Sequence, residues 1–260
     1  MNGYEMAAIA GALSWAYPIG VWIHRIFQKP SIRIIPAEYA EIGYTHFGPL
    51  LNFRCAITTE KKDAVIERLV AEIRHEKGDK YTLVWKFLDE TQFEIAPYSG
   101  EGGGYLRKYE LAIALKVSTS IPTQKLVGFQ YDEFKRQADR LVLEMSAQLD
   151  HLKRVSPETA TASIVTTREY TELTKFFENN MIWKAGKYSL AILGDVISLS
   201  SPHREEFQFT LTDSDIEVLK RNAKMFEELL AGFLGPDYGT SNALPPQPKW
   251  GWVNAKILKV

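Results

Sequence analysis

Hydrophobic and polar residues alternate along several stretches of the chain after Pro30, and this period of two predicts half-buried β-strands. Ser31–Pro36 is a short apolar run, and the alternation is clear from Leu51 to Ile57, from Tyr81 to Phe87 and from Leu111 to Val117. Turns that contain glycine separate these stretches. The pattern therefore predicts a body that is rich in strands.

The segment Asp63–His75 fits two patterns. Its apolar residues share one helical face, but they also suit a strand that is buried on both sides. Because the Gly78-Asp79 turn leads directly into the alternating stretch after it, a hairpin is favoured and we predict a strand here. Further strands are expected at residues 160–164, 183–192 and 206–211.

Three stretches carry apolar residues at spacings of three and four, which is typical of amphipathic helices. The clearest covers residues 131–154, with charged residues on its other face. A capping box at Thr166–Glu169 opens a helix near 167–180, and Thr212–Asp215 caps a last helix near 213–234. The first of these helices packs on a sheet or, alternatively, forms a coiled-coil seam between subunits.

A glycine stands shortly before a tyrosine and a leucine at two places, Gly78 to Leu83 and Gly186 to Leu190. The arrangement resembles the tyrosine corner of immunoglobulin-like sandwiches, where the tyrosine hydroxyl ties a strand to a neighbouring loop. This resemblance covers a few residues and carries no function, but it implies β-sandwich material. We therefore predict an α+β fold: a β-sandwich-like body with two or three packed helices.

Residues 6–23 contain no charged side chain over 18 positions, and as a helix they span roughly 27 Å, enough for a bilayer core. Trp15 and Trp22 suit a membrane interface, and the basic residues Arg25 and Lys29 follow the run. A cleaved signal peptide needs a basic start, which is missing here. A buried helix of a soluble domain remains an alternative interpretation. We favour a single transmembrane helix in contact with membrane lipid, with the N-terminus outside and the body in the cytoplasm. A wholly cytoplasmic chain is the alternative.

These patterns divide the chain into three parts. Residues 1–30 form the anchor and a basic collar, residues 31–234 form the β-rich body, and residues 235–260 form an irregular C-terminal arm. Trp250 and Trp252 lie in this arm, and we expect them to pack it back onto the body. About 230 residues remain for one elaborated folded body, which favours a single domain over two.

Composition and motifs narrow the range of functions. The balance of 31 Lys and Arg against 32 Asp and Glu argues against a nucleic-acid partner. Cys55 is the single cysteine, so no intrachain disulfide forms, and on its apolar strand face it is expected in the core. The five histidines have no zinc-ligand spacing, and no nucleophile elbow or phosphate loop occurs. We therefore expect no metal and no cofactor, and we assign no catalytic residue.

The richest glycine stretch contains Gly100, Gly102, Gly103 and Gly104. It predicts a hairpin loop, or alternatively a mobile lip over a binding site. Three hypotheses for the function remain. The first is a membrane-anchored cytoplasmic binding or assembly protein that contacts a protein partner or forms a homo-oligomer. The second is a soluble assembly protein that docks a partner through its N-terminal helix, and the third is an enzyme with dispersed active-site residues.

Overall fold

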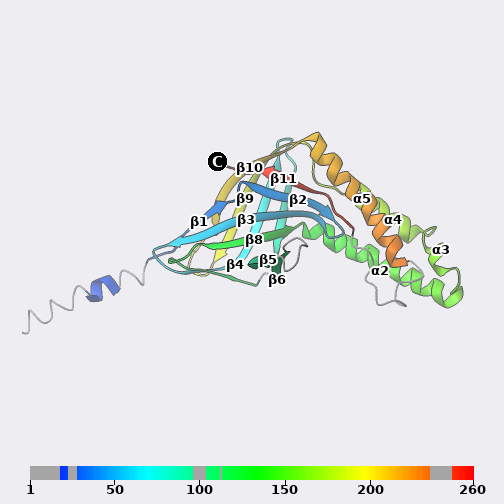
Figure 1. Ribbon diagram of the computed structural model, residues 1–260, viewed down its shortest axis with the longest axis horizontal. Coiled ribbons are helices and arrows are strands. Elements are labelled where there is room, and N and C mark those ends of the chain that lie inside the picture. Colours follow the sequence, from blue (N-terminus) through cyan, green and yellow to red (C-terminus); the bar gives the residue numbers. More distant parts are fainter. Residues whose placement is uncertain (1–17, 23–27, 96–103, 112, 235–247) are drawn as a thin grey trace, which may run out of the picture.

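A computed structural model of the chain describes residues 18–22, 28–95, 104–111, 113–234 and 248–260. Twelve strands and four helices are assigned between residues 28 and 260 of these ranges, and these four helices gather at one end of the strands (Figure 1), whereas a short helical stretch covers residues 18–22. The strands are β1 Ser31–Pro36, β2 Tyr39–Thr45, β3 Gly48–Glu60, β4 Ala64–His75, β5 Lys80–Ile95, β6 Gly104–Leu111, β7 Leu115–Val117, β8 Thr123–Gln130, β9 Gly186–Val196, β10 His203–Leu211, β11 Trp252–Lys256 and β12 Leu258–Lys259. The helices are α2 Asp132–Val155, α3 Ala160–Ile164, α4 Arg168–Asn179 and α5 Asp213–Leu234.

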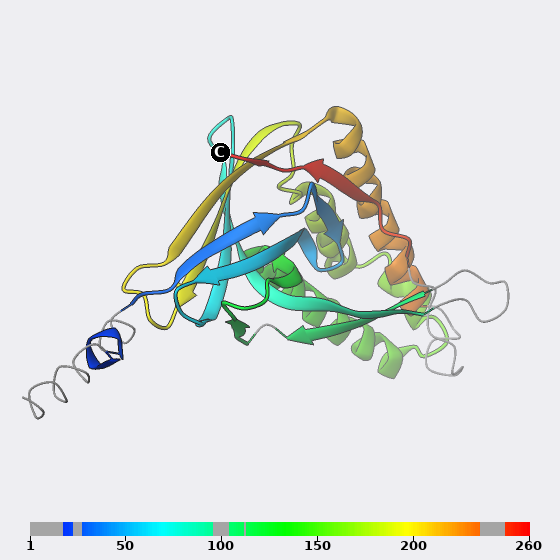
Figure 2. The same cartoon turned by 60° about the vertical axis from the view of Figure 1, so that its left-hand side comes forward.

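The described strands form one antiparallel sheet in the order β11-β2-β3-β8-β5-β4-β9-β10-β12, while β1, β6 and β7 pair with β3, β5 and β4. The sheet is nearly closed, because β11 pairs with one edge strand and β12, which follows at once, pairs with the other. Figure 2 shows this red C-terminal segment running between the blue β2 and the gold β10. The chain end thus connects the two edges of the sheet.

The structure confirms a mixed, strand-rich α+β body with packed helices. Its strands belong to one continuous curved sheet, because long strands such as β3 and β5 have neighbours on both sides, with a register shift in β5 between Trp85 and Phe87. The predicted membrane run at residues 6–23 lies outside the described residues except for 18–22, which are helical. Across the described ranges, we find no helix with both the length and the apolar character needed to cross a bilayer.

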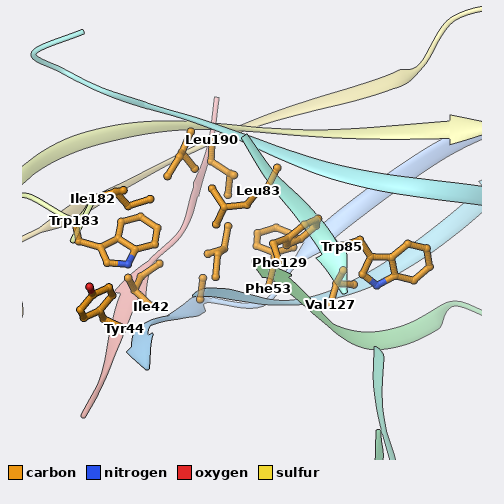
Figure 3. Close-up of a cluster of buried hydrophobic side chains, with 14 of the residues drawn as sticks. Ile42, Tyr44, Phe53, Leu83, Trp85, Val127, Phe129, Ile182, Trp183 and Leu190 are labelled. Carbon is orange, nitrogen blue, oxygen red and sulfur yellow. The ribbon is translucent and has the colours of Figure 1, made fainter. Parts of the chain in front are cut away.

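The inner face of the sheet, meaning the face that carries the core, is filled by apolar side chains at alternate positions. Phe53 of β3 and Phe129 of β8 converge with Leu83 of β5 in the centre (Figure 3), and all three are buried. The indole Nε1 of Trp183 donates a hydrogen bond of 2.9 Å to the carbonyl of Gly43, so this buried polar group is paired. The inner face therefore forms an apolar core in which the buried indole N–H of Trp183 has a hydrogen-bond partner.

The helices close one end of this core through aromatic contacts. Phe134 of α2 packs edge-on against Tyr44 of β2, with ring centroids 5.7 Å apart, and against Phe177 of α4 at 5.1 Å. Phe226 of α5 stacks on Phe177 at 3.5 Å. The Tyr44 hydroxyl donates to the backbone carbonyl of Phe177, and burial raises the pKa of this phenol well above its usual range. One aromatic cluster thus joins three helices to the sheet.

Several local predictions are confirmed. The segment predicted as a strand between Asp63 and His75 is β4, which pairs with β5 and β9. The hydroxyl of Tyr188 accepts from the Lys184 N–H at 2.7 Å and donates to its carbonyl at 3.0 Å, as expected for a tyrosine that ties a strand to a loop. Thr212 and Asp215 exchange hydrogen bonds as a capping box at the start of α5.

Other predictions are wrong. Residues 160–164 form helix α3 instead of a strand, because Ala160 and Ile164, four positions apart, are the residues that turn inward. The stretch from Leu111 to Val117 belongs to two strands, and Ile113 between them is 81% exposed. Residues 252–259 form strands β11 and β12 instead of an irregular arm, because the edges of β2 and β10 offer them backbone partners.

Candidate functional site

The site residues predicted from sequence are not brought together within the described ranges. Trp22 and Lys29 are exposed, whereas Trp15 and Arg25 lie outside the described residues. Gly104 begins β6, and Gly100, Gly102 and Gly103 also lie outside. Ile95 and Gly104 pair in the β5–β6 ladder, so the glycine run connects two neighbouring strands. Its role as a lip over a binding site stays a prediction.

The buried nucleophilic and imidazole side chains of the core are structural. Burial raises the pKa of the Cys55 thiol to about 12, so the thiol stays protonated and unreactive at neutral pH. His75, which the sequence analysis did not place in the core, is buried, and its Nε2 lies 3.1 Å from the Ala185 carbonyl. In the part of the chain that the structure describes, no three His, Cys, Asp or Glu side chains gather as a metal site would require.

A hollow of about 700 Å³ lies on the outer face of the sheet, over β11, β2, β3, β8 and β5. We call it the outer groove. Leu50 of β3 and Leu126 of β8 line it and are buried, yet neither belongs to the core cluster on the inner face. Because side chains alternate between the faces of a strand, these leucines mark a second apolar floor. The outer groove is therefore separate from the packed interior.

Two aromatic rings border the outer groove, and each covers a glycine on the neighbouring strand. Trp252 of β11 lies opposite Gly43 of β2, where a Cβ atom would come within 2.3 Å of the indole. Phe87 of β5 lies opposite Gly128 of β8, where a Cβ atom would come within 2.1 Å of the phenyl ring. Glycine at these two strand positions therefore allows the rings to lie close to the backbone.

A polar row crosses the floor between the rings. Asn254, Glu41 and Asn52 are neighbours in register on β11, β2 and β3, and the same row continues through Gly128 to Phe87. The Asn52 amide donates a hydrogen bond of 3.1 Å from Nδ2 to the Glu41 carboxylate. Asn52 is only 7% exposed, and its Oδ1 has no hydrogen-bond partner among the described residues. A buried acceptor without a donor costs free energy, so it marks a position where a ligand would be stabilising.

The β2–β3 turn forms one end of the outer groove. The His46 ring lies 3.8 Å from the ring of Phe47 and 5.7 Å from that of Trp250, measured between centroids. Burial and the nearby Lys135 ammonium lower the pKa of His46, which favours the neutral imidazole. Its Nδ1 is buried and has no partner in the described part of the chain. Gln130 holds the turn by donating to the Phe47 carbonyl at 2.7 Å.

Helix α5 fixes the backbone between the two groove tryptophans. Asn222 is 1% exposed, and its amide accepts from the N–H of Gly251 and donates to its carbonyl, both at 2.8 Å. A Cβ atom at Gly251 would meet Val218 of the same helix at 2.7 Å. Because residues 250 and 252 flank this clamp, the aromatic wall is held in place before any ligand arrives.

A second hollow, of about 400 Å³, lies between α2 and α5 and shares His46 and Phe47 with the outer groove. Its other walls are mostly apolar, with Val142 and Met145 on α2 facing Leu230 on α5. Besides the shared His46, its described polar side chains are half-buried or exposed, and none of them is a buried group without a partner: Lys135, Asp139, Ser146 and Lys153. The outer groove is thus the better-equipped of the two hollows.

Sequence reasoning did not find the outer groove. The sequence features that correspond to the groove are isolated glycines within strands and a polar residue, Asn52, in an alternating run. An isolated glycine in a strand marks a bulge or a close approach, but a single sequence does not say what approaches. Comparison of the chain with protein-family models, with curated proteins and with solved structures found no match.

Proposed function

We propose that this protein is a binding protein and that its outer groove holds a small polar ligand. The observation that carries the proposal is the buried, unpartnered Oδ1 of Asn52 in the floor of the groove. Ligand sites combine apolar and aromatic walls with a few well-placed polar groups, and the outer groove has both. The clamp between Asn222 and Gly251 adds support, because a wall that is already ordered costs less to organise on binding.

We further propose that residues 6–23 anchor this binding protein to a membrane, with residues 30–260 on the cytoplasmic side. The support comes from the uncharged run and from the basic residues that follow it. Deleting residues 1–30 should release the body from membrane fractions, and protease protection in intact cells should report a cytoplasmic C-terminus. Unchanged membrane fractionation after the deletion would refute the anchor and leave the groove proposal standing.

The groove proposal is tested by closing the groove without touching its polar row. Gly43→Ala places a methyl group against Trp252 and should displace its ring, whereas Gly194→Ala meets Leu69 only at 3.3 Å and lies away from the groove. Equilibrium dialysis of the full chain against a mixture of small polar compounds, read by mass spectrometry, should show enrichment with the native protein and the Gly194 variant. Enrichment that survives in Gly43→Ala would contradict the proposal, as would its absence from the native protein.

A further inference from the structure

The polar atom without a partner in the floor of the outer groove is a hydrogen-bond acceptor. A carboxylate only accepts hydrogen bonds, so the Asn52 side chain must direct its NH₂ group to Glu41. This contact orients the amide and leaves Oδ1 as the atom without a partner. A ligand that satisfies the floor must therefore bring N–H or O–H donors.

The floor also carries a negative charge that has no counterion among the described residues. The hydrogen bond from Asn52 is the one interaction that the described residues make with the Glu41 carboxylate, and no basic side chain among them pairs with it. Glu41 is half-buried, and among the described residues that line the groove it is the only acidic one. A carboxylate in such a position favours a cation and disfavours an anion.

The aromatic walls point to the same chemistry. Phe87 ends the polar row on β5, Trp252 lies two residues before Asn254 on β11, and Trp250 also lines the groove. The faces of aromatic rings carry negative electrostatic potential and attract ammonium and guanidinium groups, tryptophan most strongly. The two ring-covered strands, β2 and β8, are separated by one strand, so their axes lie about 10 Å apart. That spacing suits one small head group.

We propose that the outer groove binds an organic cation that carries N–H groups, either a primary alkylammonium or an alkylguanidinium. The cation would donate to Oδ1 of Asn52 and to the Glu41 carboxylate, with its alkyl part against Leu50 and the tryptophan wall. A free amine and a lysine or arginine side chain of a peptide share this chemistry. The inference rests on the proposed binding function of the groove, and it adds the class of ligand.

The test compares matched probes on the full chain by isothermal titration calorimetry and by tryptophan fluorescence. n-Butylammonium and n-butylguanidinium should bind at least tenfold more tightly than 1-butanol, which has the same length and a donor but no charge. Tetramethylammonium, which has no N–H group, should bind more weakly than n-butylammonium. A pentapeptide with a central lysine then identifies the source: tenfold tighter binding than n-butylammonium indicates a side chain, and equal binding indicates a free amine.

Two substitutions locate the site. Glu41→Gln should reduce n-butylammonium affinity at least tenfold, whereas Glu38→Gln, which removes an exposed carboxylate that pairs with Lys256, should leave it within twofold. Circular dichroism and thermal melting confirm that both variants fold. Equal affinity for n-butylammonium and 1-butanol, or an unaffected Glu41→Gln variant, would overturn the cation inference while keeping a ligand groove. If none of the probes binds, nor any compound in the dialysis mixture, the proposed function itself fails.

Discussion

The two faces of strands β2, β3 and β8 are built from alternate residues of the same segments. They differ in whether their buried polar atoms have hydrogen-bond partners. On the inner face, Phe53 and Phe129 fill the core, and the indole of Trp183 has its hydrogen-bond partner. On the outer face, Asn52 is almost as buried, but one of its polar atoms has no partner among the described residues. Burial on the inner face thus stabilises the fold, whereas burial on the outer face leaves a polar atom unpaired among the described residues, at the place where we propose a binding site.

The largest expected effect is a difference in stability between truncating a ring on the inner face and truncating one on the outer face. Phe129→Ala removes a fully buried ring from the inner face and should lower the free energy of unfolding by about 3–5 kcal/mol. Phe87→Ala removes a half-buried ring from the outer face and should cost only about 1–2 kcal/mol. Urea denaturation followed by circular dichroism measures both. Equal losses would show that the outer face is a second core and not a site.

Asn222 is the point where the fold and the outer face meet. Asn222→Ala removes both hydrogen bonds to Gly251 and should destabilise the protein by about 2 kcal/mol, because two backbone groups lose their partner. The same change should weaken ligand binding, since the tryptophan wall loses its clamp. Asn180→Ala is the control, because it removes a single exposed hydrogen bond and should change stability by about 0.5 kcal/mol or less. Normal stability in Asn222→Ala would contradict the clamp.

Lowering the pH should reduce the stability that Glu205, a carboxylate at the end of the inner face, contributes. Burial of Glu205 acts to raise its pKa, but hydrogen bonds from Lys259 and from the Ile34 N–H outweigh it, so the pKa is lowered from 4.5. A lowered folded-state pKa means that the carboxylate stabilises the protein above its unfolded pKa and loses this effect as pH falls through the folded value. The advantage of the native protein over Glu205→Gln should be about 1 kcal/mol or less near pH 7 and disappear in acid. An advantage that grows with acid would contradict this assignment.

The smallest expected change in stability is the most informative about the outer face. Asn52→Leu replaces a buried amide by an apolar side chain of similar size, so the unpaired Oδ1 disappears together with the hydrogen bond to Glu41. Stability should stay within about 0.5 kcal/mol of the native value, while groove binding is lost. Thermal melting and calorimetry on the same sample give both values. A loss of stability with binding intact would make Asn52 a purely structural residue.

The predictability of the fold differs from element to element. β1 could be predicted from its short apolar run, β4 from the Gly78-Asp79 turn that favours a hairpin, and the main helices from their long three-four spacing. β2 and β8 were missed, since Gly43 and Gly128 interrupt their apolar runs, and both glycines are explained only by rings from other strands. The outer groove could not be predicted for the same reason.

What the sequence determined by itself is local. Alternation along β3 settles that Phe53 and Asn52 point to opposite faces, and capping residues such as Thr212 settle where a helix begins. Which residues meet across the sheet was decided only by the tertiary structure. Glu41, Asn52, Phe87 and Asn254 come from four separate strands, and they share one row because antiparallel register aligns them. Strand register depends on the packing of the whole sheet, whereas periodicity and capping depend on neighbours in the chain.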